Sequence, residues 1–462
     1  MKSNHMISKL VGDEVRGQGK WISSICGKDG SIYGIPFDAQ RRILRFNPGD
    51  HSRTYVGPYF GTDTRIEDDN EDENEDEDDN DDDEDDEMED LDVWGMWRGG
   101  VLANDGFIYC PPYNADKILK IDTTRTDTCT ITLMDLVLPE QGICGRWASG
   151  APALDGCIYF MPAGAHHILK LDPNGNDGHG TVSSVGMYLG IADNKYLGTV
   201  AGMDGVIYGI PHNDNRIIKY DPVTEVISFL GELEDELFEC HGGAVGRDGN
   251  IYALMGAGRI LKIDIELCAF SFNYLTSTLL KEGETFGWTN AIAGIDGCIY
   301  WVPGDSNRIL KYDPQTEHNS FVGELGADED KWYSGCSTPD GTIYCIPFNA
   351  LRVLMIIDPF KDFTVRLKRD MEQYPEQLGL LFLENDEGIT AYDSEVTKFG
   401  PQKVFQAVVE CLPPADQLFA ASNLYPFIVG ASCHNSTALS VIYFLLRQVP
   451  SLISSTNVSP TA

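Results

Sequence analysis

Hydrophobic and polar positions recur in one order seven times between residues 20 and 360. Each copy has Asp-Gly, then Ile-Tyr two residues after the glycine, and then a segment of the type RILKIDP whose apolar residues alternate with polar ones. Alternation with a period of two is the pattern of a β-strand and excludes a helix. The Asp-Gly pairs are Asp29-Gly30, Asp105-Gly106, Asp155-Gly156, Asp204-Gly205, Asp248-Gly249, Asp296-Gly297 and Asp340-Gly341.

Each copy predicts a four-stranded antiparallel meander. Asp-Gly permits positive φ at both central positions, so we expect it to close a two-residue hairpin between the first two strands. A proline seven residues after the Asp, present in all copies except the fifth, is expected to end the second strand. Asp-Pro is expected to follow the third strand, and segments such as ISFLGEL supply a weaker fourth strand.

The spacing of the copies predicts the architecture. Successive Asp-Gly pairs are 76, 50, 49, 44, 48 and 44 residues apart, and the first interval becomes 50 when the 26-residue acidic tract at 67–92 is subtracted. Four-stranded units of this length are typical of propeller blades around a central channel. We therefore predict an all-β, seven-bladed β-propeller over residues 1–370, with a disordered acidic insertion at 67–92.

A propeller ring must pair its last blade with its first, and two segments could supply the closing strand. Residues 7–12 resemble a fourth strand that has no blade of its own, because Gly12 precedes Trp21 by nine residues as Gly323 precedes Trp332. Residues 362–367 (DFTVRL) also resemble a fourth strand after the seventh Asp-Pro. The sequence leaves eight candidates for seven positions.

The residues after the repeats, 371–462, predict a small α-helical extension. PQKVFQAVVECL places Val404, Phe405, Val408, Val409 and Leu412 on one face of a helix. Further on, Tyr425-Pro426-Phe427 and the apolar residues Val441, Leu445 and Leu446 resemble a single degenerate ankyrin unit, which departs from that pattern at Ile428. One such unit cannot bury its own apolar face, so we expect this tail to dock on the propeller or to be the remnant of a longer array.

Charge and cysteine content narrow the function classes. The net charge is −38, of which the acidic tract supplies 21 carboxylates with no Lys or Arg, so we expect no nucleic-acid partner. The absence of a signal peptide and of a long apolar run predicts a soluble, cytoplasmic, monomeric protein with no membrane contact. We expect the 12 cysteines to be reduced thiols, and the eight that lie within the repeats to pack in the interior.

No motif for catalysis, a cofactor or a metal ion is present, so we expect none of the three. An aromatic residue precedes six of the seven Asp-Gly pairs by eight residues, at the start of the innermost strand, where we expect it to pack between blades rather than form a ligand cage. The loops between second and third strands should lie on the same face of the ring as the loops that join successive blades, and we call this the upper face. Candidate ligand-binding residues at this face are Trp97, Arg146, Trp147, His166, His167, His212, His241, Trp288, Asp305 and Trp332.

The repeat DGxIYxxPxxxxRILKIDP resembles that of a group of uncharacterised propeller-repeat proteins from microalgae, over about 350 residues. This resemblance implies the fold and no activity. A looser similarity is to gluconolactonase and streptogramin-lyase propellers, which would imply a metal or a catalytic His/Glu set at the channel mouth. No such set can be matched to residues of this sequence.

Two functions are consistent with these features. The first is a non-enzymatic protein-interaction scaffold that binds a basic protein or peptide through the acidic tract and the acidic loops 232–239 and 324–330 of the upper face. The second is a lactonase-like propeller hydrolase or lyase that acts at the channel mouth, with or without a divalent metal.

Overall fold

The computed structural model describes residues 6–411, apart from 38–40, 61–94, 135, 136, 138, 139, 141, 142, 234–238, 276–286, 327 and 374–389. The chain separates into two compact units. One is formed by Ile7–Ile356 and the other by Met1–Met6 with Ile357–Ala462.

The first unit is a seven-bladed β-propeller of four-stranded antiparallel sheets, which confirms the predicted fold class. Blade 1 contains β2 (Trp21–Cys26), β3 (Ile32–Pro36), β4 (Ile43–Phe46) and β5 (Arg53–Val56); blade 2 contains β6 (Val101–Leu102), β7 (Phe107–Cys110), β8 (Ile118–Asp122) and β9 (Ile131–Met134); blade 3 contains β10 (Trp147–Pro152), β11 (Ile158–Pro162), β12 (Ile168–Asp172) and β13 (Thr181–Val185). Blade 4 contains β14 (Tyr196–Ala201), β15 (Ile207–Pro211), β16 (Ile217–Asp221) and β17 (Val226–Leu230); blade 5 contains β18 (Gly243–Val245), β19 (Ile251–Met255), β20 (Arg259–Asp264) and β21 (Ala269–Tyr274); blade 6 contains β22 (Trp288–Ala293), β23 (Ile299–Pro303), β24 (Ile309–Asp313) and β25 (His318–Val322).

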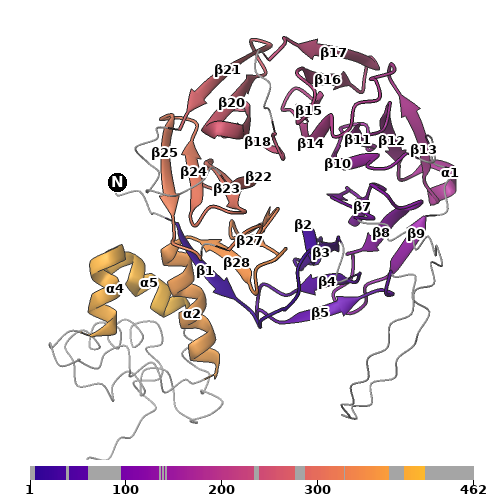
Figure 1. Cartoon of the computed structure of the whole chain (residues 1–462). Coiled ribbons are helices and arrows are strands. Elements are labelled where there is room, and N and C mark those ends of the chain that lie inside the picture. Colours follow the sequence, from indigo (N-terminus) through magenta and orange to yellow (C-terminus); the bar gives the residue numbers. More distant parts are fainter. Residues whose placement is uncertain are drawn as a thin grey trace, which may run out of the picture. The chain divides into compact units, whose positions relative to one another are not determined.

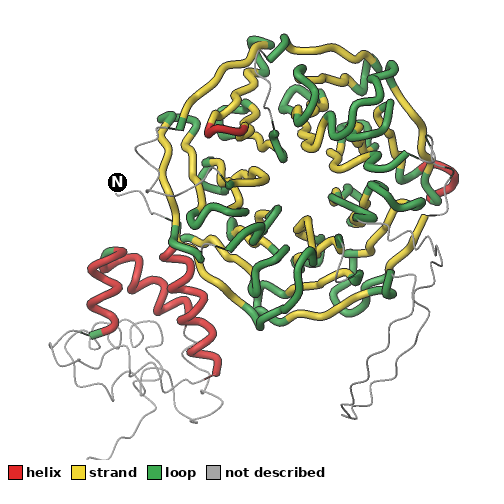
Figure 2. Tube along the Cα trace, viewed as in Figure 1, coloured by secondary structure: helices red, strands yellow, loops and turns green. Residues whose placement is uncertain are grey.

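Blade 7 is the one sheet of the ring that joins distant parts of the sequence. Its order is β1 (Ile7–Val11), β28 (Val353–Ile357), β27 (Ile343–Cys345) and β26 (Cys336–Ser337), so the N-terminal strand is its outermost strand. Figure 1 shows β1 beside β28 at the outer edge of the ring, and Figure 2 shows the strands arranged in a ring. Of the two segments proposed for closure, residues 7–12 therefore supply the strand.

Hydrogen bonds around β1 and β2 join blade 7 to blade 1. The backbone N–H of Val15 donates to Leu351 O at 2.7 Å, and that of Lys20 donates to Phe348 O at 3.2 Å. On the channel side, Ser24 Oγ accepts from Ile346 N at 2.9 Å. These bonds span more than 300 residues of sequence and hold the first blade against the last.

The Asp-Gly hairpins have a different turn from the one predicted. Gly30 N donates to Gly27 O at 3.1 Å and Gly27 N donates to Ser31 O at 2.8 Å, so three residues form the loop instead of two. Only the glycine of each pair has positive φ, which is 81° at Gly30. Asp29 keeps negative φ because its Oδ1 accepts a hydrogen bond from Ser31 N at 3.0 Å. A positive φ at Asp29, as in the predicted two-residue turn, would break this side-chain turn.

The repeated Asp and Tyr of each copy form a structural clasp. In blades 1 to 6 the carboxylate accepts a hydrogen bond from the tyrosine hydroxyl four residues later, at distances of 2.7 to 3.0 Å. In four blades a Lys or Arg of the third strand pairs with the same carboxylate; the pairs are Arg45–Asp29, Lys170–Asp155, Lys262–Asp248 and Lys311–Asp296. The repeat is therefore a packing motif rather than a site.

These clasps predict that the protein loses stability in acid. Burial opposes ionisation of Asp296, but hydrogen bonds from Lys311 and Tyr300 outweigh it and hold the pKa of Asp296 below its ordinary value. Because the pKa is lower in the folded state, the stabilisation is complete above the unfolded pKa of about 4 and is lost as the pH falls through the folded pKa. The urea midpoint should therefore fall between about pH 5 and pH 3. Asp296→Asn should reduce this fall, whereas Asp127→Asn at an exposed carboxylate should leave it unchanged.

The second unit contains the helices α2 (Pro359–Gln373), α4 (Ala391–Phe399) and α5 (Pro401–Cys411). The prediction of a strand at 362–367 is wrong, because these residues lie within α2. Asp358 Oδ1 accepts from the backbone N–H groups of Phe360 and Lys361 at 2.9 and 3.1 Å, which caps a helix that begins at Pro359. β1 takes the fourth position of blade 7, so that position is not available to this segment.

The predicted helix in PQKVFQAVVECL is confirmed as α5, and its Val404 and Val408 are buried. Phe360 and Phe363 of α2 contact Phe399 of α4 at ring distances of 5.2 and 6.2 Å. The ankyrin-like segment and Leu412 lie outside the described residues. No helix in the described part of the chain is long and apolar enough to cross a membrane.

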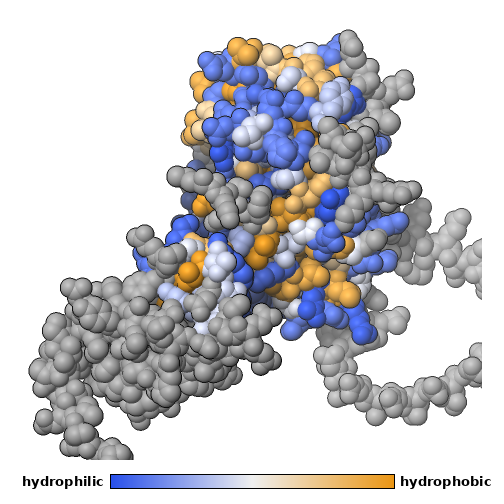
Figure 3. All heavy atoms as spheres, turned by 90° about the vertical axis from the view of Figure 1, so that its left-hand side faces the viewer, coloured by the Kyte–Doolittle hydropathy of each residue, from blue (hydrophilic) through white to orange (hydrophobic). Residues whose placement is uncertain are grey.

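Short helical turns also occur within the propeller unit. α1 (Gly175–Gly178) follows β12, and the 3-10 turn at Gly256–Gly258 joins β19 to β20. The outer surface that lies at the left of Figure 1 mixes hydrophilic and hydrophobic residues (Figure 3). Every described cysteine from Cys26 to Cys345 is a free thiol, and Cys110, Cys157, Cys240, Cys298 and Cys345 are buried.

Candidate functional site

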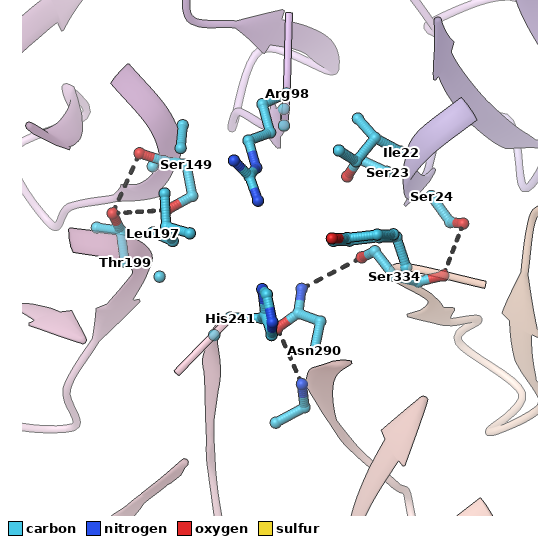
Figure 4. A pocket seen from close by; sticks show the side chains of 18 of the residues that line it. Ile22, Ser23, Ser24, Arg98, Ser149, Leu197, Thr199, His241, Asn290 and Ser334 are labelled. Carbon is cyan, nitrogen blue, oxygen red and sulfur yellow. Dashed lines mark hydrogen bonds between the residues drawn. The ribbon is translucent and has the colours of Figure 1, made fainter. Parts of the chain in front are cut away.

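A cavity lies in the central channel, where the innermost strands of all seven blades meet. It has a volume of about 220 Å³. Side chains and glycines from the first strand of each blade line it, and Figure 4 shows Arg98, His241 and Asn290 around it. The lining residues belong mainly to the three positions that follow the aromatic residue of each repeat.

The first of these positions leaves the strand ladder. In blades 1, 3, 4 and 6 the pairing of the inner strand shifts directly after the aromatic residue, between Trp147 and Ser149 for example. Such a bulge leaves one residue unpaired and redirects its side chain. In blades 2, 5 and 7 the inner strand begins only at Val101, Gly243 and Cys336. The seven residues at this position are Ile22, Arg98, Ala148, Leu197, His241, Thr289 and Tyr333.

The three blades with shortened inner strands carry the residues with the most distinctive chemistry, namely Arg98, His241 and Tyr333. Glycines follow Arg98 and His241 because the inner strands approach one another closely there. A Cβ at Gly99 would lie 2.6 Å from Ala148 O, and one at Gly242 would lie 1.9 Å from Asn290 Oδ1. The shortened strands and glycines thus make room for larger side chains at the channel.

Hydroxyl and amide groups form the rest of the polar lining. Ser149 and Thr199 join blades 3 and 4 through a hydrogen bond of 2.9 Å between their hydroxyls. Asn290 Nδ2 donates to Ser334 Oγ at 3.2 Å and joins blades 6 and 7 in the same way. These groups tie adjacent blades and give the cavity a neutral polar wall (Figure 4).

Arg98 is the cation of the cavity. Its Nη1 donates to the Tyr113 hydroxyl at 3.4 Å, and its guanidinium carbon is 5.5 Å from the centre of the Tyr113 ring. Tyr113 is itself fixed by donating to Asn194 Oδ1 at 3.0 Å. Among the described residues, no carboxylate pairs with Arg98, and its charge acts on the histidines and Tyr333 nearby.

A row of aromatic rings runs from the upper rim to the cavity wall. It is formed by Phe37, Phe348, Tyr333, His241 and His212, and the distances between successive ring centres are 5.7, 5.1, 5.7 and 5.3 Å. We refer to these five residues as the aromatic arc. It brings together side chains from blades 1, 4, 5 and 7 and offers ring faces and edges to an apolar molecule.

Both histidines of the aromatic arc are held neutral near pH 7. Burial, together with the nearby His212 and Arg98, lowers the pKa of His241 to about 4. Burial also lowers the pKa of His212, although its Nδ1 lies 3.2 Å from Cys240 O. His241 Nδ1 is buried and has no hydrogen-bond partner within the described part of the chain.

Cations that the sequence did not single out begin several inner strands. Lys20, Lys195 and Lys331 each stand directly before the aromatic residue, and their side chains are buried. Each ammonium donates to a backbone carbonyl three residues earlier, at 2.5 to 2.8 Å. Burial lowers the pKa of Lys20 to about 8. Arg146 is the equivalent residue of blade 3; it is buried, and its Nη2 donates to Ala115 O.

The four candidate tryptophans pack in the interior. Trp97, Trp147, Trp288 and Trp332 are at most 5% exposed, and their side chains are absent from the cavity lining. Each indole N–H donates to a backbone carbonyl at the start of the third strand, at distances of 2.6 to 3.0 Å. These bonds explain why an aromatic residue recurs there: it fastens the inner strand to the middle of its own blade.

The remaining candidates fall into separate places. His241 lines the cavity and His212 contacts it. His166 and His167 lie at Glu140, whose Oε1 is 2.5 Å from His167 Nδ1. Asp305 lies on the rim, where its Oδ1 accepts from Asp330 N at 2.8 Å. Of the ten residues proposed from sequence, the structure thus brings His241 to the cavity wall and places His212 against the His241 ring.

Arg98, Tyr333 and Asn290 are the lining residues that sequence reasoning missed. A signal for Arg98 and Tyr333 exists, because the position after the recurrent aromatic residue changes chemistry from copy to copy; Asn290 stands one residue further on. Among the described residues that line the cavity, none is Asp or Glu. No group of three His, Cys, Asp or Glu that could hold a metal ion occurs within the described residues.

Comparisons with known proteins place the chain by its fold. No protein-family model and no curated protein matches the sequence. The chain is similar to a structure of streptogramin B lyase, at 14% identity over 76% of this chain and 97% of that one, with a TM-score of 0.53. It is also similar to a catalytically inactive variant of virginiamycin B lyase from Staphylococcus aureus with quinupristin, at 13% identity over 76% and 99% of the two chains and a TM-score of 0.53. At these identities the likeness confirms the looser propeller similarity and shows a shared fold alone.

Proposed function

We propose that the protein is a non-enzymatic interaction scaffold that binds a basic protein or peptide on its upper face. The observation that carries this proposal is where the acidic tract joins the propeller. Phe60, just before it, donates its N–H to Arg41 O at 2.8 Å and packs 5.0 Å from the Trp97 ring. Gly95, just after it, lies against the Phe37 ring. Both attachment points lie near the start of an inner strand, so the tract that carries the 21 carboxylates is attached at the upper rim.

Carboxylates on the described part of the rim also favour binding of a basic partner on the upper face. Asp305 and Asp330 are in contact, and burial together with the charges of Asp305 and Glu329 raises the pKa of Asp330. Like charges held this close are relieved by a cationic partner. A rigid ring with a negative rim therefore favours a basic ligand, and the attraction should weaken with salt.

The test is binding of a poly-lysine peptide of about 20 residues, measured by thermophoresis at several salt concentrations. Deletion of 67–92 should weaken binding at least about tenfold at low salt and flatten the salt dependence. A variant with the tract reordered but its composition kept should bind as the parent does. A variant with every Asp and Glu of the tract changed to Asn and Gln should behave like the deletion. Equal affinity for the parent and the neutral variant would refute the proposal.

The geometry favours binding over catalysis at the channel mouth. His241, its neighbour His212 and Asn290 are polar groups that a hydrolase or lyase could use. The described lining adds no carboxylate that could act as a second acid or base. The lyase-like alternative is therefore supported by the shared fold, and no arrangement of catalytic groups in the described lining supports it.

A further inference from the structure

We propose that the channel cavity is a binding site for a small monocarboxylate that carries a flat ring, with Arg98 as the group that holds the carboxylate. This site differs from the acidic rim in its position and in the sign of its charge. The proposal rests on three observations: a guanidinium at the cavity that no described carboxylate pairs with, a neutral polar wall beside it, and the aromatic arc.

The first observation is the state of Arg98. In a chain of net charge −38, a guanidinium at a cavity with no carboxylate partner among the described residues is unexpected. Partial burial removes water from its N–H groups, and the single contact of 3.4 Å with the Tyr113 hydroxyl leaves most of its five donors unused. The guanidinium carbon lies 5.5 Å from the centre of the Tyr113 ring, which restrains the side chain. A guanidinium can offer a pair of N–H groups to the two oxygens of a carboxylate.

The second observation concerns the charge of the ligand. Ser149, Thr199, Asn290 and Ser334 give the wall hydroxyls and amides, and His241 is held neutral. Arg98 is thus the one cation among the described lining residues. One positive charge matches a monoanion, whereas a doubly charged phosphate would keep one charge uncompensated in a partly desolvated site. The site chemistry therefore favours a carboxylate.

The third observation concerns the body of the ligand. Tyr333 and His241 of the aromatic arc line the cavity, and Ile22 and Leu197 add aliphatic surface. Flat rings pack well against such walls, either stacked or edge to face. A cavity of about 220 Å³ holds several times the roughly 30 Å³ that one water molecule occupies, which is room for a single small ring and its carboxylate.

The experiment measures binding of benzoate to the full chain by isothermal titration and ligand-observed NMR, with benzamide and acetate as matched comparisons. Benzamide keeps the ring and removes the charge, and acetate keeps the charge and removes the ring. We expect benzoate to bind with a Kd of about 1 mM or lower and each comparison to bind at least about tenfold more weakly. Inorganic phosphate should also bind more weakly than benzoate.

The variants assign the binding to Arg98. Arg98→Gln should weaken benzoate binding at least about tenfold and leave the residual binding unable to discriminate benzoate from benzamide. Arg98→Lys keeps the charge without the paired N–H geometry, so its affinity for benzoate should lie between those of the parent and Arg98→Gln. Arg247→Gln, the same change at an arginine far from the cavity lining, should bind as the parent does. Circular dichroism of each variant checks that it is folded.

Several outcomes would overturn the site. They are the absence of benzoate binding at about 10 mM, equal binding of benzoate by the parent and by both Arg98 variants, and tighter binding of phosphate than of benzoate. Deletion of 67–92 should leave benzoate binding intact. Loss of poly-lysine binding with benzoate binding retained therefore separates this site from the scaffold function.

Discussion

A chain that begins at residue 13 should be strongly destabilised or fail to close its ring. It lacks β1, which is the outermost strand of blade 7 and is hydrogen-bonded to β28. A ladder hydrogen bond contributes about 0.5–1.5 kcal/mol net, and burial of an apolar side chain such as Val11, which is 7% exposed, contributes up to about 1.5–3 kcal/mol. The free energy of unfolding should thus fall by about 4 kcal/mol or more. Urea unfolding followed by circular dichroism measures this loss.

The same deletion should change how the protein associates. Without β1, the edge of β28 presents unpaired backbone groups that can pair with another copy of the chain. Analytical ultracentrifugation should therefore detect dimers or larger species for this variant. A chain that begins at Met6 keeps β1 and should match the parent in both measurements. A shortened chain with an unchanged urea midpoint and unchanged sedimentation would show that β1 does not close the ring.

The architecture could be predicted because each blade repeats the same local physics. Asp-Gly, Ile-Tyr and the terminal proline specify one antiparallel unit, and seven copies leave few alternatives to a propeller. The competition between 7–12 and 362–367 could not be decided locally, since both segments have strand-like alternation. The outcome depended on a helix cap at Asp358 and on a single open position in blade 7.

The candidate site was harder to predict because a residue that packs inside a blade and a residue that lines the channel are adjacent in the sequence. The sequence drew attention to the recurrent tryptophans, whose indoles are fastened inside their own blades. The tryptophan position holds Tyr196 in blade 4 and Cys240 in blade 5, and the residue directly after this position leaves the ladder through a bulge or a shortened strand and lines the cavity in six of the seven blades. Bulges and strand ends depend on how seven blades pack around an axis, which the repeat pattern does not encode.

Trp147→Ala should be the most destabilising single substitution of those considered. The Trp147 side chain is fully buried and packs with Val101 and Tyr109 of blade 2 as well as Phe160 of its own blade. Truncating such a residue costs about 3–5 kcal/mol, because the surrounding residues cannot fill the space. It also removes the N–H that donates to His167 O at 3.0 Å. Urea unfolding measures the loss, and Leu154→Ala, at a side chain that is 93% exposed, should change it by at most about 0.5 kcal/mol.

Trp147→Phe separates packing from ligand binding at this position. Phenylalanine keeps much of the buried apolar surface but leaves His167 O without its donor, which should cost about 1–3 kcal/mol. Because Trp147 does not line the cavity, the folded variant should bind benzoate as the parent does. The opposite result, with stability retained and benzoate binding lost, would mean that the tryptophan ring acts as a ligand cage. Arg98→Gln should keep the stability of the parent and lose benzoate binding, because the Arg98 guanidinium faces the cavity and belongs to no described ion pair (Figure 4).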